Sequence, residues 1–242
     1  MSAQTKITIN HDIDSRMLVI RNYDLFAHLT EQEFQELDLV HNFIEAKKGD
    51  YIYFESQFLN KLFFIKEGFI KIGYIDNNGN EIIKEIIQKG EIFGQFTLER
   101  NNLNGEFAQV HKSNVSLCAF TIENFQHILN NNHQIAIAFS RQVGNKLRRV
   151  ENRLMNMLNT DVKTRLLRFF KELIHSNKEC STDNHFLIDN FLTHDDIARL
   201  IGSSRQTVTV TLNLLELEGL IKISRKQIEI ADISAIEKAA LL

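Results

Sequence analysis

Apolar and polar residues change their spacing several times along this chain of 242 residues, and each change predicts a different structure. Residues 1–24 show little periodicity, which is typical of a loosely ordered arm. Residues 25–37 have helical spacing, with Thr30 placed as an N-cap and Glu33 three residues later, the spacing of a capping box. A short helix is therefore expected to begin at Thr30.

Residues 43–121 have a different pattern, in which short apolar runs are separated by turn residues. This pattern indicates an antiparallel all-β domain, and Asn78-Gly79 predicts a hairpin with a primed turn. Residues 82–87 fit a helical period better than a strand period, but the turn before them and Gly90 after them favour a strand. The clearest apolar runs are residues 51–54, 62–65, 69–75 and 115–120.

The pattern is helical over residues 122–129 and again over 132–158. In the second segment the apolar residues recur every three or four positions, close to a coiled-coil seam. At least part of such a stripe must pack on the chain's own sheet, but its narrowness and length favour a partner helix and a symmetric homodimer. The seam consists of Ile135, Phe139, Val143, Leu147, Val150, Leu154 and Met157.

The most informative pattern lies at residues 193–221, after another amphipathic helix at 161–175. Two short helical stretches are separated by Gly202, which is the order of a helix-turn-helix. The apolar faces are Ile197, Leu200 and Ile201 in the first stretch and Val208, Leu212 and Leu215 in the second.

Polar residues open the second of these helices, where a helix-turn-helix reads DNA. Residues of these types suit phosphates and base edges, whereas a helical hairpin inside a core would not need them. Two apolar runs, 220–223 and 227–230, then flank a polar tip and predict a β-hairpin wing. The polar residues of the second helix are Ser203, Ser204, Arg205, Gln206 and Thr209.

Composition is that of an ordinary globular protein, with 43% hydrophobic and 24% charged residues. No apolar stretch approaches the ~18 residues of a membrane span, and the first residues lack the apolar segment of a secretory signal, so a cytoplasmic protein without membrane contact is expected. Two cysteines, Cys118 and Cys180, cannot form a disulfide framework. Cys118 lies in an apolar run and is expected to be buried.

The net charge of −3 does not by itself indicate nucleic acid. From Asp161 onward, eleven Lys and Arg face twelve Asp and Glu. The position of the positive charges matters more than their sum, and several fall in the helix-turn-helix and the wing, so modest non-specific DNA affinity is expected. These are Arg199, Arg205, Lys222, Arg225 and Lys226.

Catalytic and metal-binding patterns are not found in the sequence. There is no phosphate-binding loop, no metal-ligand spacing and no nucleophile elbow. His194-Asp195-Asp196 looks like a metal triplet, but an acidic helix N-terminus explains it more simply. We therefore expect no enzyme activity, no metal and no cofactor.

The order of these segments over about residues 24–232 resembles the cAMP receptor protein and Fnr (Crp/Fnr) family of bacterial transcription regulators. The most specific match is IARLIGSSRQTV, supported by KKGDYIYFESQ, LFFIKEGFIKI and KGEIFG in the same order. The resemblance implies an α+β fold: an N-terminal β-roll of the cyclic-nucleotide-binding type, a long dimerisation helix and a C-terminal winged helix-turn-helix. The expected boundaries are residues 1–24 for the arm, 25–130 for the roll, 131–159 for the helix and 160–242 for the DNA-binding domain.

The resemblance also implies roles on double-stranded DNA. Arg205 matches an arginine that contacts a guanine, and Gln206 replaces the family's glutamate and suits adenine. Val210 stands where the family has a second base-reading arginine; together with Thr209 it offers methyl groups to a thymine.

Phosphate contacts are implied for a further group of residues, which set register rather than sequence. Thr193, Ser204 and Thr207 resemble the family's phosphate-contacting hydroxyls, Ser203 accompanies them, and Lys226 is the wing candidate. The family resemblance further implies a homodimer on a palindromic operator and RNA polymerase as a partner.

The effector pocket departs from the family pattern. Cyclic-nucleotide-binding members have Gly-Glu-Leu, whose acid holds the ribose, and Arg-Ser-Ala, whose arginine holds the phosphate. A carboxylate in the place of that arginine would repel the phosphate, so cAMP is not expected to bind. The two stretches here read Gly94-Gln95-Phe96 and Glu106-Phe107-Ala108.

Other sensing chemistries also lack their residues, and the effector stays unassigned. An iron–sulfur cluster of the family's kind needs four cysteines, and single histidines such as His41 and His111 have no evident second haem ligand. An alternative remains open, in which the roll is a regulatory or protein-interaction module with an unidentified ligand and no operator. DNA binding that is lost on Arg205→Ala would separate the two interpretations.

Overall fold

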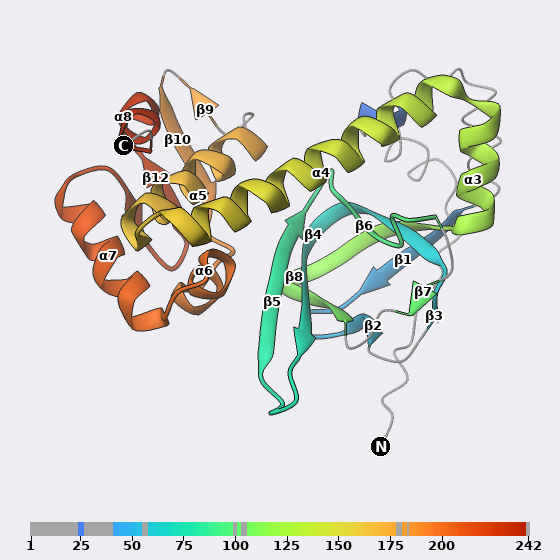
Figure 1. Ribbon diagram of the computed structural model, residues 1–242, viewed down its shortest axis with the longest axis horizontal. Coiled ribbons are helices and arrows are strands. Elements are labelled where there is room, and N and C mark those ends of the chain that lie inside the picture. The colour runs from blue at the N-terminus through green and yellow to red at the C-terminus, as the bar shows by residue number, and fades with distance from the viewer. Residues whose placement is uncertain are drawn as a thin grey trace. The chain divides into compact units, whose positions relative to one another are not determined.

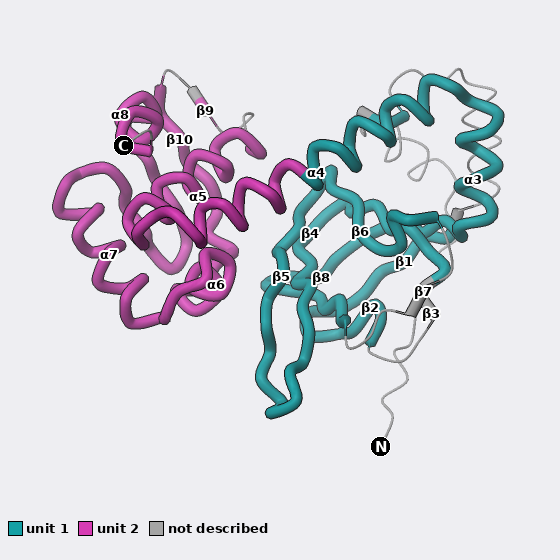
Figure 2. The backbone as a smooth tube through the Cα atoms, viewed as in Figure 1, with its two compact units in different colours: residues 1–147 teal, residues 148–242 magenta. Residues whose placement is uncertain are grey.

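The computed structural model describes residues 24–26, 41–54, 58–98, 101–102, 106–177, 181–182 and 184–240. The chain divides into two compact units, residues 1–147 and 148–242 (Figure 2), and each is described by itself. The predicted arm and the helix expected at 25–37 lie outside the described residues, except for a single 3-10 turn, η1 (Asp24–Phe26).

The first unit is built on antiparallel strands, as the sequence predicts for residues 43–121 (Figure 1). Its main sheet has the order β1-β8-β4-β5, with β2 paired to β8 and β6 paired to β4, while β3 and β7 pair separately. The strands are β1 (His41–Ala46), β2 (Tyr51–Phe54), β3 (Phe58–Leu59), β4 (Lys61–Ile75), β5 (Glu81–Gln88), β6 (Ile92–Gly94), β7 (Asn101–Asn102) and β8 (Glu106–Thr121). The segment with ambiguous periodicity, 82–87, is strand β5, as predicted.

Alternating residues of the long strands β4 and β8 supply two separate cores, because successive strand side chains point to opposite faces. On β4, Leu62 and Phe64 belong to one core, and Phe63 and Ile65 belong to the other. The predicted burial of Cys118 is confirmed, and its side chain lies in the first of these cores. Burial of both faces explains why these runs are continuously apolar.

The hairpin between β4 and β5 forms as predicted, but the predicted primed turn is wrong. Both kinds of primed turn need a positive φ at the first central residue, here Asn78, but only Gly79 has one, at +80°. Asp76 instead closes a three-residue loop: its N–H donates to Asn80 O at 2.9 Å, and its carbonyl accepts from Gly79 N at 2.9 Å. The Asp76 carboxylate accepts from the backbone N–H groups of Asn78 and Asn80, which stabilises the longer loop.

Two helices follow the roll at the predicted places. Thr121 caps α3 (Ile122–Asn131), and α4 (His133–Asn159) runs for 27 residues. Ile135 and Phe139, at the start of α4, are buried with Phe125 of α3 in the core that also holds Leu62 and Phe64. This end of α4 therefore fastens the helix to the roll.

The second unit combines the end of α4 with a small sheet and four helices (Figure 1). Its sheet has the order β11-β12-β10-β9. The elements are α5 (Val162–Ser176), β9 (Ser181–Thr182), β10 (His185–Asp189), α6 (His194–Ile201), α7 (Arg205–Leu217), β11 (Lys222–Ile223), β12 (Gln227–Ile230) and α8 (Ile233–Ala239). The helix-turn-helix and its wing are thus confirmed as elements of the fold, while α8 was not anticipated.

The boundary between the units falls inside α4, whereas the sequence placed it near residues 159–160. The last turns of α4 belong to the second unit and contact its helices α6 and α5. Arg153 Nη2 donates to Arg199 O at 3.2 Å, and Asn156 accepts from Arg168. None of the described helices has the length and apolarity that crossing a membrane requires.

Candidate nucleic-acid interface and effector pocket

The first helix of the helix-turn-helix, α6, begins with a complete capping box. The Thr193 hydroxyl accepts from Asp196 N at 3.1 Å, and Thr193 N donates to Asp196 Oδ2 at 2.8 Å. Ile197 and Ile201 are buried on the face that α6 turns toward the core. The acidic pair at the start of α6 thus has a structural role, and no group of His, Cys, Asp and Glu within the described residues is arranged to hold a metal.

Gly202 makes the turn between α6 and α7 possible. Its φ of +67° is the left-handed conformation that ends many helices, and Ser203 N donates to Ala198 O at 2.8 Å across the turn. Arg165 of α5 donates from Nη1 to Ile201 O at 2.9 Å and to Gly202 O at 3.0 Å. A guanidinium therefore satisfies the last carbonyls of α6 and fixes the angle at which α7 leaves.

The second helix, α7, divides into a buried and an exposed face. Val208, Leu212 and Leu215 are buried. Arg205 and Gln206 in the first turn are exposed, Thr209 is half-buried, and Val210 is 55% exposed. The residues that the sequence assigned to base edges therefore share the outer side of α7 near its start.

Two of the hydroxyl residues assigned to phosphates, Thr193 and Ser204, are N-caps, and all four lie near the surface. Ser204 is the N-cap of α7; its Oγ accepts from Thr207 N at 3.1 Å and lies 2.8 Å from Thr207 Oγ1. Thr193 and Thr207 are exposed, and Ser203 is half-buried. These residues hold the ends of α6 and α7 next to the exposed face of α7.

The wing is an antiparallel pair, β11 and β12, with a tightly bonded tip. Ser224 N donates to Gln227 O at 2.9 Å, and Ser224 Oγ accepts from Gln227 N at 2.9 Å. Asn190 Nδ2 donates to Ser224 O at 2.7 Å and ties the tip to the chain before α6. Arg225 and Lys226 are exposed at this tip.

One contact at this interface was missed by the sequence analysis. His194, the first residue of α6, places its Nδ1 2.9 Å from Thr209 Oγ1 of α7. These residues are fifteen positions apart, so only the angle between α6 and α7 brings them together. The sequence indicates only that His194 lies at an acidic helix N-terminus, and nothing in it predicts the contact with Thr209.

Glu106, which the sequence assigned to the effector pocket, is buried at 4% exposure and hydrogen-bonded on both oxygens. Tyr53 donates its hydroxyl to Oε1 at 2.8 Å, while Tyr74 and Lys84 donate to Oε2 at 3.1 and 2.8 Å. Strands β2, β4 and β5 thus each supply a donor to a carboxylate on β8. The following residues Phe107 and Ala108 are fully buried.

The same network shifts the titration of its members. Burial raises the pKa of the Tyr53 hydroxyl, and the Glu106 carboxylate beside it raises this pKa further. Burial by itself would lower the pKa of Lys84, but the hydrogen bond and the charge of Glu106 outweigh it, so the net shift is upward. Lys84 is therefore held as an ammonium against Glu106.

Gln95, also assigned to the effector pocket from the sequence, is buried at 3% exposure. Its Nε2 donates to Thr97 Oγ1 at 2.5 Å, whereas Oε1 has no hydrogen-bond partner among the described residues. Gly94 ends β6 and pairs with Leu62 of β4. Gln95 Oε1 is thus a buried acceptor that pairs with no donor of the described residues.

Phe96 and the adjoining strand connect this region to α4. The Phe96 ring stacks on Phe139 with centroids 6.2 Å apart, and Lys146 Nζ lies 5.0 Å from the Phe96 centroid. Lys146 also donates to the Glu85 carboxylate of β5 at 2.6 Å. Two residues of α4 therefore clamp the segment that follows Gln95.

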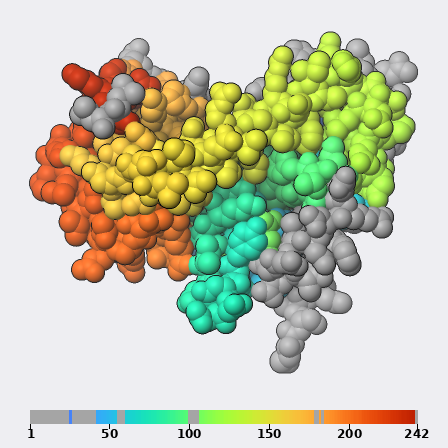
Figure 3. All heavy atoms as spheres, viewed as in Figure 1, coloured from blue at the N-terminus to red at the C-terminus, as the bar shows by residue number. Residues whose placement is uncertain are grey.

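The structure corrects the first part of the predicted dimer seam. Ile135 and Phe139 are buried in the chain's own core, and Val143 packs against it, so these three residues do not form a free stripe. The later part is uncovered: Leu147, Val150 and Leu154 are 56–58% exposed, and Met157 is 37% exposed. Figure 3 shows these last turns of α4 (yellow) at the surface of the face in view.

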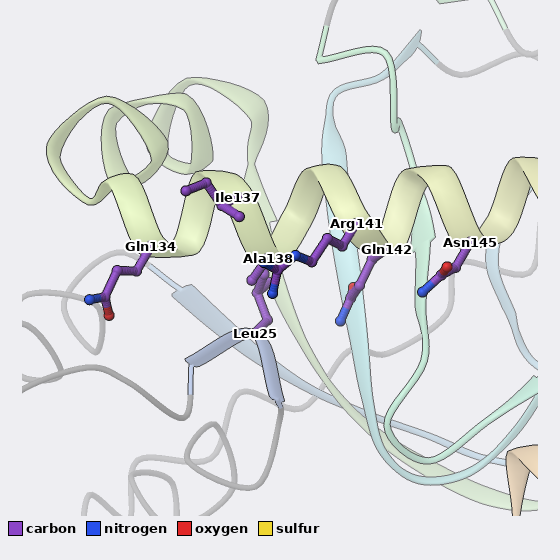
Figure 4. Close-up of a pocket in the computed structure, with 7 residues that line it drawn as sticks. All are labelled: Leu25, Gln134, Ile137, Ala138, Arg141, Gln142 and Asn145. Atoms are coloured by element: carbon purple, nitrogen blue, oxygen red, sulfur yellow. The ribbon is translucent and has the colours of Figure 1, made fainter.

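A hollow of about 510 Å³ lies along the beginning of α4 (Figure 4). None of the residues that the sequence assigned to the effector pocket lines it. Its lining exposes more apolar than polar surface and comes from α4 and η1: Leu25, Gln134, Ile137, Ala138, Arg141, Gln142 and Asn145.

Comparison with known proteins agrees with this architecture. The cyclic nucleotide-binding domain model matches residues 43–132, and the Crp-like helix-turn-helix domain model matches residues 164–239. A global nitrogen regulator of Nostoc sp. is 26% identical over 74% of this chain and 80% of its own length. The anaerobic regulatory protein of Bacillus subtilis is 23% identical over 74% of this chain and 75% of its own length.

Solved structures share the fold over nearly the whole chain. A CooA mutant from Carboxydothermus hydrogenoformans has a TM-score of 0.70 at 18% identity, covering 96% of this chain and 98% of that one. A transcriptional regulator of the CRP/FNR family from Thermus thermophilus has a TM-score of 0.61 at 22% identity, covering 83% and 98%. A roll of the cyclic-nucleotide-binding type followed by a winged helix-turn-helix defines a DNA-binding transcription regulator. The chain belongs to the Crp/Fnr family of these regulators.

Proposed function

We propose that this regulator acts as a homodimer that places α7 of each protomer in the major groove of one half of a palindromic operator. The observation that carries the proposal is the outer face of α7, where Arg205 and Gln206 are exposed directly after the Gly202 turn. An arginine bidentate to guanine O6 and N7 is the commonest specific contact to a base edge.

Sequence preference follows from the side chains on that face. Arg205 fixes one guanine in each half-site, and Gln206 favours an adenine through N6 and N7. Val210 cannot donate to a guanine, so an A·T pair whose thymine methyl meets Val210 or Thr209 is expected there.

Phosphate contacts set the register of the protein on the operator. Ser203, Ser204 and Thr207 lie around the start of α7, Thr193 caps α6, and Lys226 extends from the wing tip. Contacts of this kind are insensitive to sequence and weaken as salt rises.

Dimerisation through the end of α4 holds two recognition helices about one DNA turn, ~34 Å, apart. The stripe offered to a second copy is Leu147, Val150, Leu154 and Met157, and Leu158, one turn beyond Leu154 and 70% exposed, widens its end. Removing these side chains from water supplies the driving force for association.

The roll of this protein is proposed not to respond to cyclic nucleotides. The Glu106 carboxylate lies where a phosphate would need a cation, and Lys84 already neutralises it. The effector is thus another molecule or none, and RNA polymerase is the expected partner at the promoter because the protein belongs to a family of transcription regulators.

Selection of duplexes from a random DNA pool tests the proposal. The wild type should enrich a palindrome that has a fixed guanine in each half-site and an A·T pair where the family reads a second guanine. Arg205→Ala should lower affinity by ~1–3 kcal/mol and relax preference at that guanine alone.

Two results would count against this assignment. Recovery of unmodified TGTGA-like half-sites by the wild type would show that Val210 does not face the groove as assigned. Failure to enrich any sequence would favour the alternative, a roll that serves a protein partner without an operator.

A further inference from the structure

The contact between His194 and Thr209 crosses from α6 to α7 at the edge of the exposed face of α7. His194 Nδ1 lies 2.9 Å from Thr209 Oγ1, and both residues are half-buried. Thr209 is one helical turn beyond Arg205 and adjacent to Val210. The imidazole is therefore held beside the residues assigned to DNA.

The second hydrogen bond of Thr209 fixes where the protons lie. Thr209 Oγ1 donates to Arg205 O, four residues earlier, at 2.9 Å, a bond that threonine commonly makes inside helices. A hydroxyl has one hydrogen to donate, so toward His194 the oxygen accepts. Nδ1 then carries the hydrogen, and in the neutral ring Nε2 is left with a lone pair only.

The charged groups around His194 are already engaged. Asp195 Oδ2 accepts from Arg199 Nε at 2.7 Å, and Asp196 is used in the capping box with Thr193. On α7, the charged residue nearest to His194 in sequence is Arg205. On α5, Arg165 contacts the end of α6 opposite to His194. No carboxylate pairs with His194 among the described residues, so this imidazole has no internal anion to meet.

We propose that His194 is a DNA-phosphate contact that takes up one proton per subunit when the operator binds. The inference rests on the proposed function. When a helix-turn-helix docks, its first helix crosses the sugar–phosphate backbone, and His194 begins that helix. In the neutral ring, Nε2 and a phosphate oxygen would both present lone pairs and repel each other. In a ring protonated from solvent, Nε2–H donates to the phosphate while Nδ1–H still donates to Thr209 Oγ1.

The same geometry restricts what Thr209 presents to DNA. Its hydroxyl is committed to Arg205 O and to the imidazole, so its γ-methyl is the group left for a base edge. Thr209 then reads a thymine methyl together with Val210, and His194 acts as its positioning residue.

The test measures DNA affinity against pH for the full-length wild type, His194→Gln and His185→Gln. Fluorescence anisotropy is recorded with a labelled duplex from the selection and with a random-sequence duplex, from about pH 8 to about pH 6. Glutamine retains hydrogen-bonding groups but does not titrate in this range. His185 lies on β10 beside Glu229, so its substitution controls for a second histidine of the same unit.

Wild type and His185→Gln should tighten on both duplexes as pH falls, by up to about tenfold per pH unit for each proton taken up. His194→Gln should lose that gain. At about pH 6 its plot of log affinity against log salt should be shallower by about one per subunit, a change that a merely structural role would not produce. Thr209→Val, which keeps a methyl but removes the oxygen, should reduce the pH response as well.

The outcomes separate this inference from the proposed function. If the wild type binds neither duplex at any pH, the proposed function fails. If the wild type binds but shares its pH profile and salt slope with His194→Gln, only the role of His194 is wrong. Thermal melting at both pH values checks that His194→Gln folds; if it does not, Thr209→Val decides, and an unchanged pH response in that variant overturns the inference.

Discussion

At the scale of single residues, Glu106 shows how the roll accommodates a buried carboxylate. A buried carboxylate is costly unless it is paired and hydrogen-bonded, and three donors from three strands meet that need. Lys84 lies on the edge strand β5, and its side chain is 43% exposed. It neutralises the Glu106 side chain, which is 5% exposed. Lys84 and Glu106 thus form an internal ion pair at a position that the sequence assigned to the effector pocket.

The first prediction is that cAMP and cGMP do not bind the wild type, as measured by titration calorimetry. Replacing Glu106 by arginine alone would set two cations against each other, so the restoring variant is Glu106→Arg with Lys84→Gln, which leaves the arginine without an internal carboxylate partner at position 84. This double variant should gain some affinity for cAMP if the roll keeps its shape. Micromolar binding of cAMP to the wild type would contradict the reasoning.

Residue types on the outer face of α7 could be predicted because they follow a helical period inside one element. The contact of His194 with Thr209 could not, since it depends on the angle between two helices. The network around Glu106 was hidden for the same reason: Tyr53, Tyr74 and Lys84 come from three different strands. The sequence shows that Glu106 carries a negative charge, but it does not show that Lys84 neutralises it.

At the scale of elements, turns and caps decided the outcome where periodicity was ambiguous. Strand β5 has helix-like spacing, yet its pairing with β4 makes it a strand. The hairpin before it was predicted correctly, but its turn type was wrong because the Asp76 carboxylate stabilises a longer loop. In α4 the stripe is continuous, and its spacing could not show that the first part meets the chain's own core.

Gly202 gives the second prediction, at the element that joins α6 to α7. Gly202→Ala should lower the free energy of unfolding by about 1–2 kcal/mol, because alanine is strained at a left-handed φ. The added methyl would also lie 3.0 Å from Met157 Cε, a flexible side-chain end that is able to move. Chemical denaturation measures the loss.

The matched control is Gly202→Asn, since asparagine adopts this conformation more readily than alanine does. Asparagine should retain more stability than alanine at this position. Equal losses in the two variants would mean that the contact with Met157, and not backbone strain, requires glycine.

At the scale of the whole molecule, α4 belongs to both compact units. Its beginning is buried with the roll, and its end bonds to the helix-turn-helix unit through Arg153 and Asn156. The remaining apolar stripe has no partner within the described part of the chain. A second copy of the protein is the proposed partner.

Leu154→Glu gives the third prediction. A charge in the stripe should dissociate the dimer and weaken operator binding together, because both recognition helices must be held in place. Light scattering and anisotropy measure the two effects. Asn152→Glu, which adds the same charge on another side of the same helix, should preserve both.

A wild type that is monomeric at micromolar concentration and still binds a palindrome tightly would defeat the dimer proposal. Loss of the dimer in Asn152→Glu as well would show that any added charge on α4 is harmful, in which case the stripe itself would not be the interface.

Lys84 and Glu85 are consecutive on β5, at the bulge where the pairing register of β5 with β4 shifts. One binds Glu106 inside the roll, and the other holds Lys146 of α4. A coupling free energy between two sites acts equally in both directions. If a molecule that competes for Lys84 displaces this segment and with it α4, then displacement of α4 must change the affinity for that molecule by the same factor.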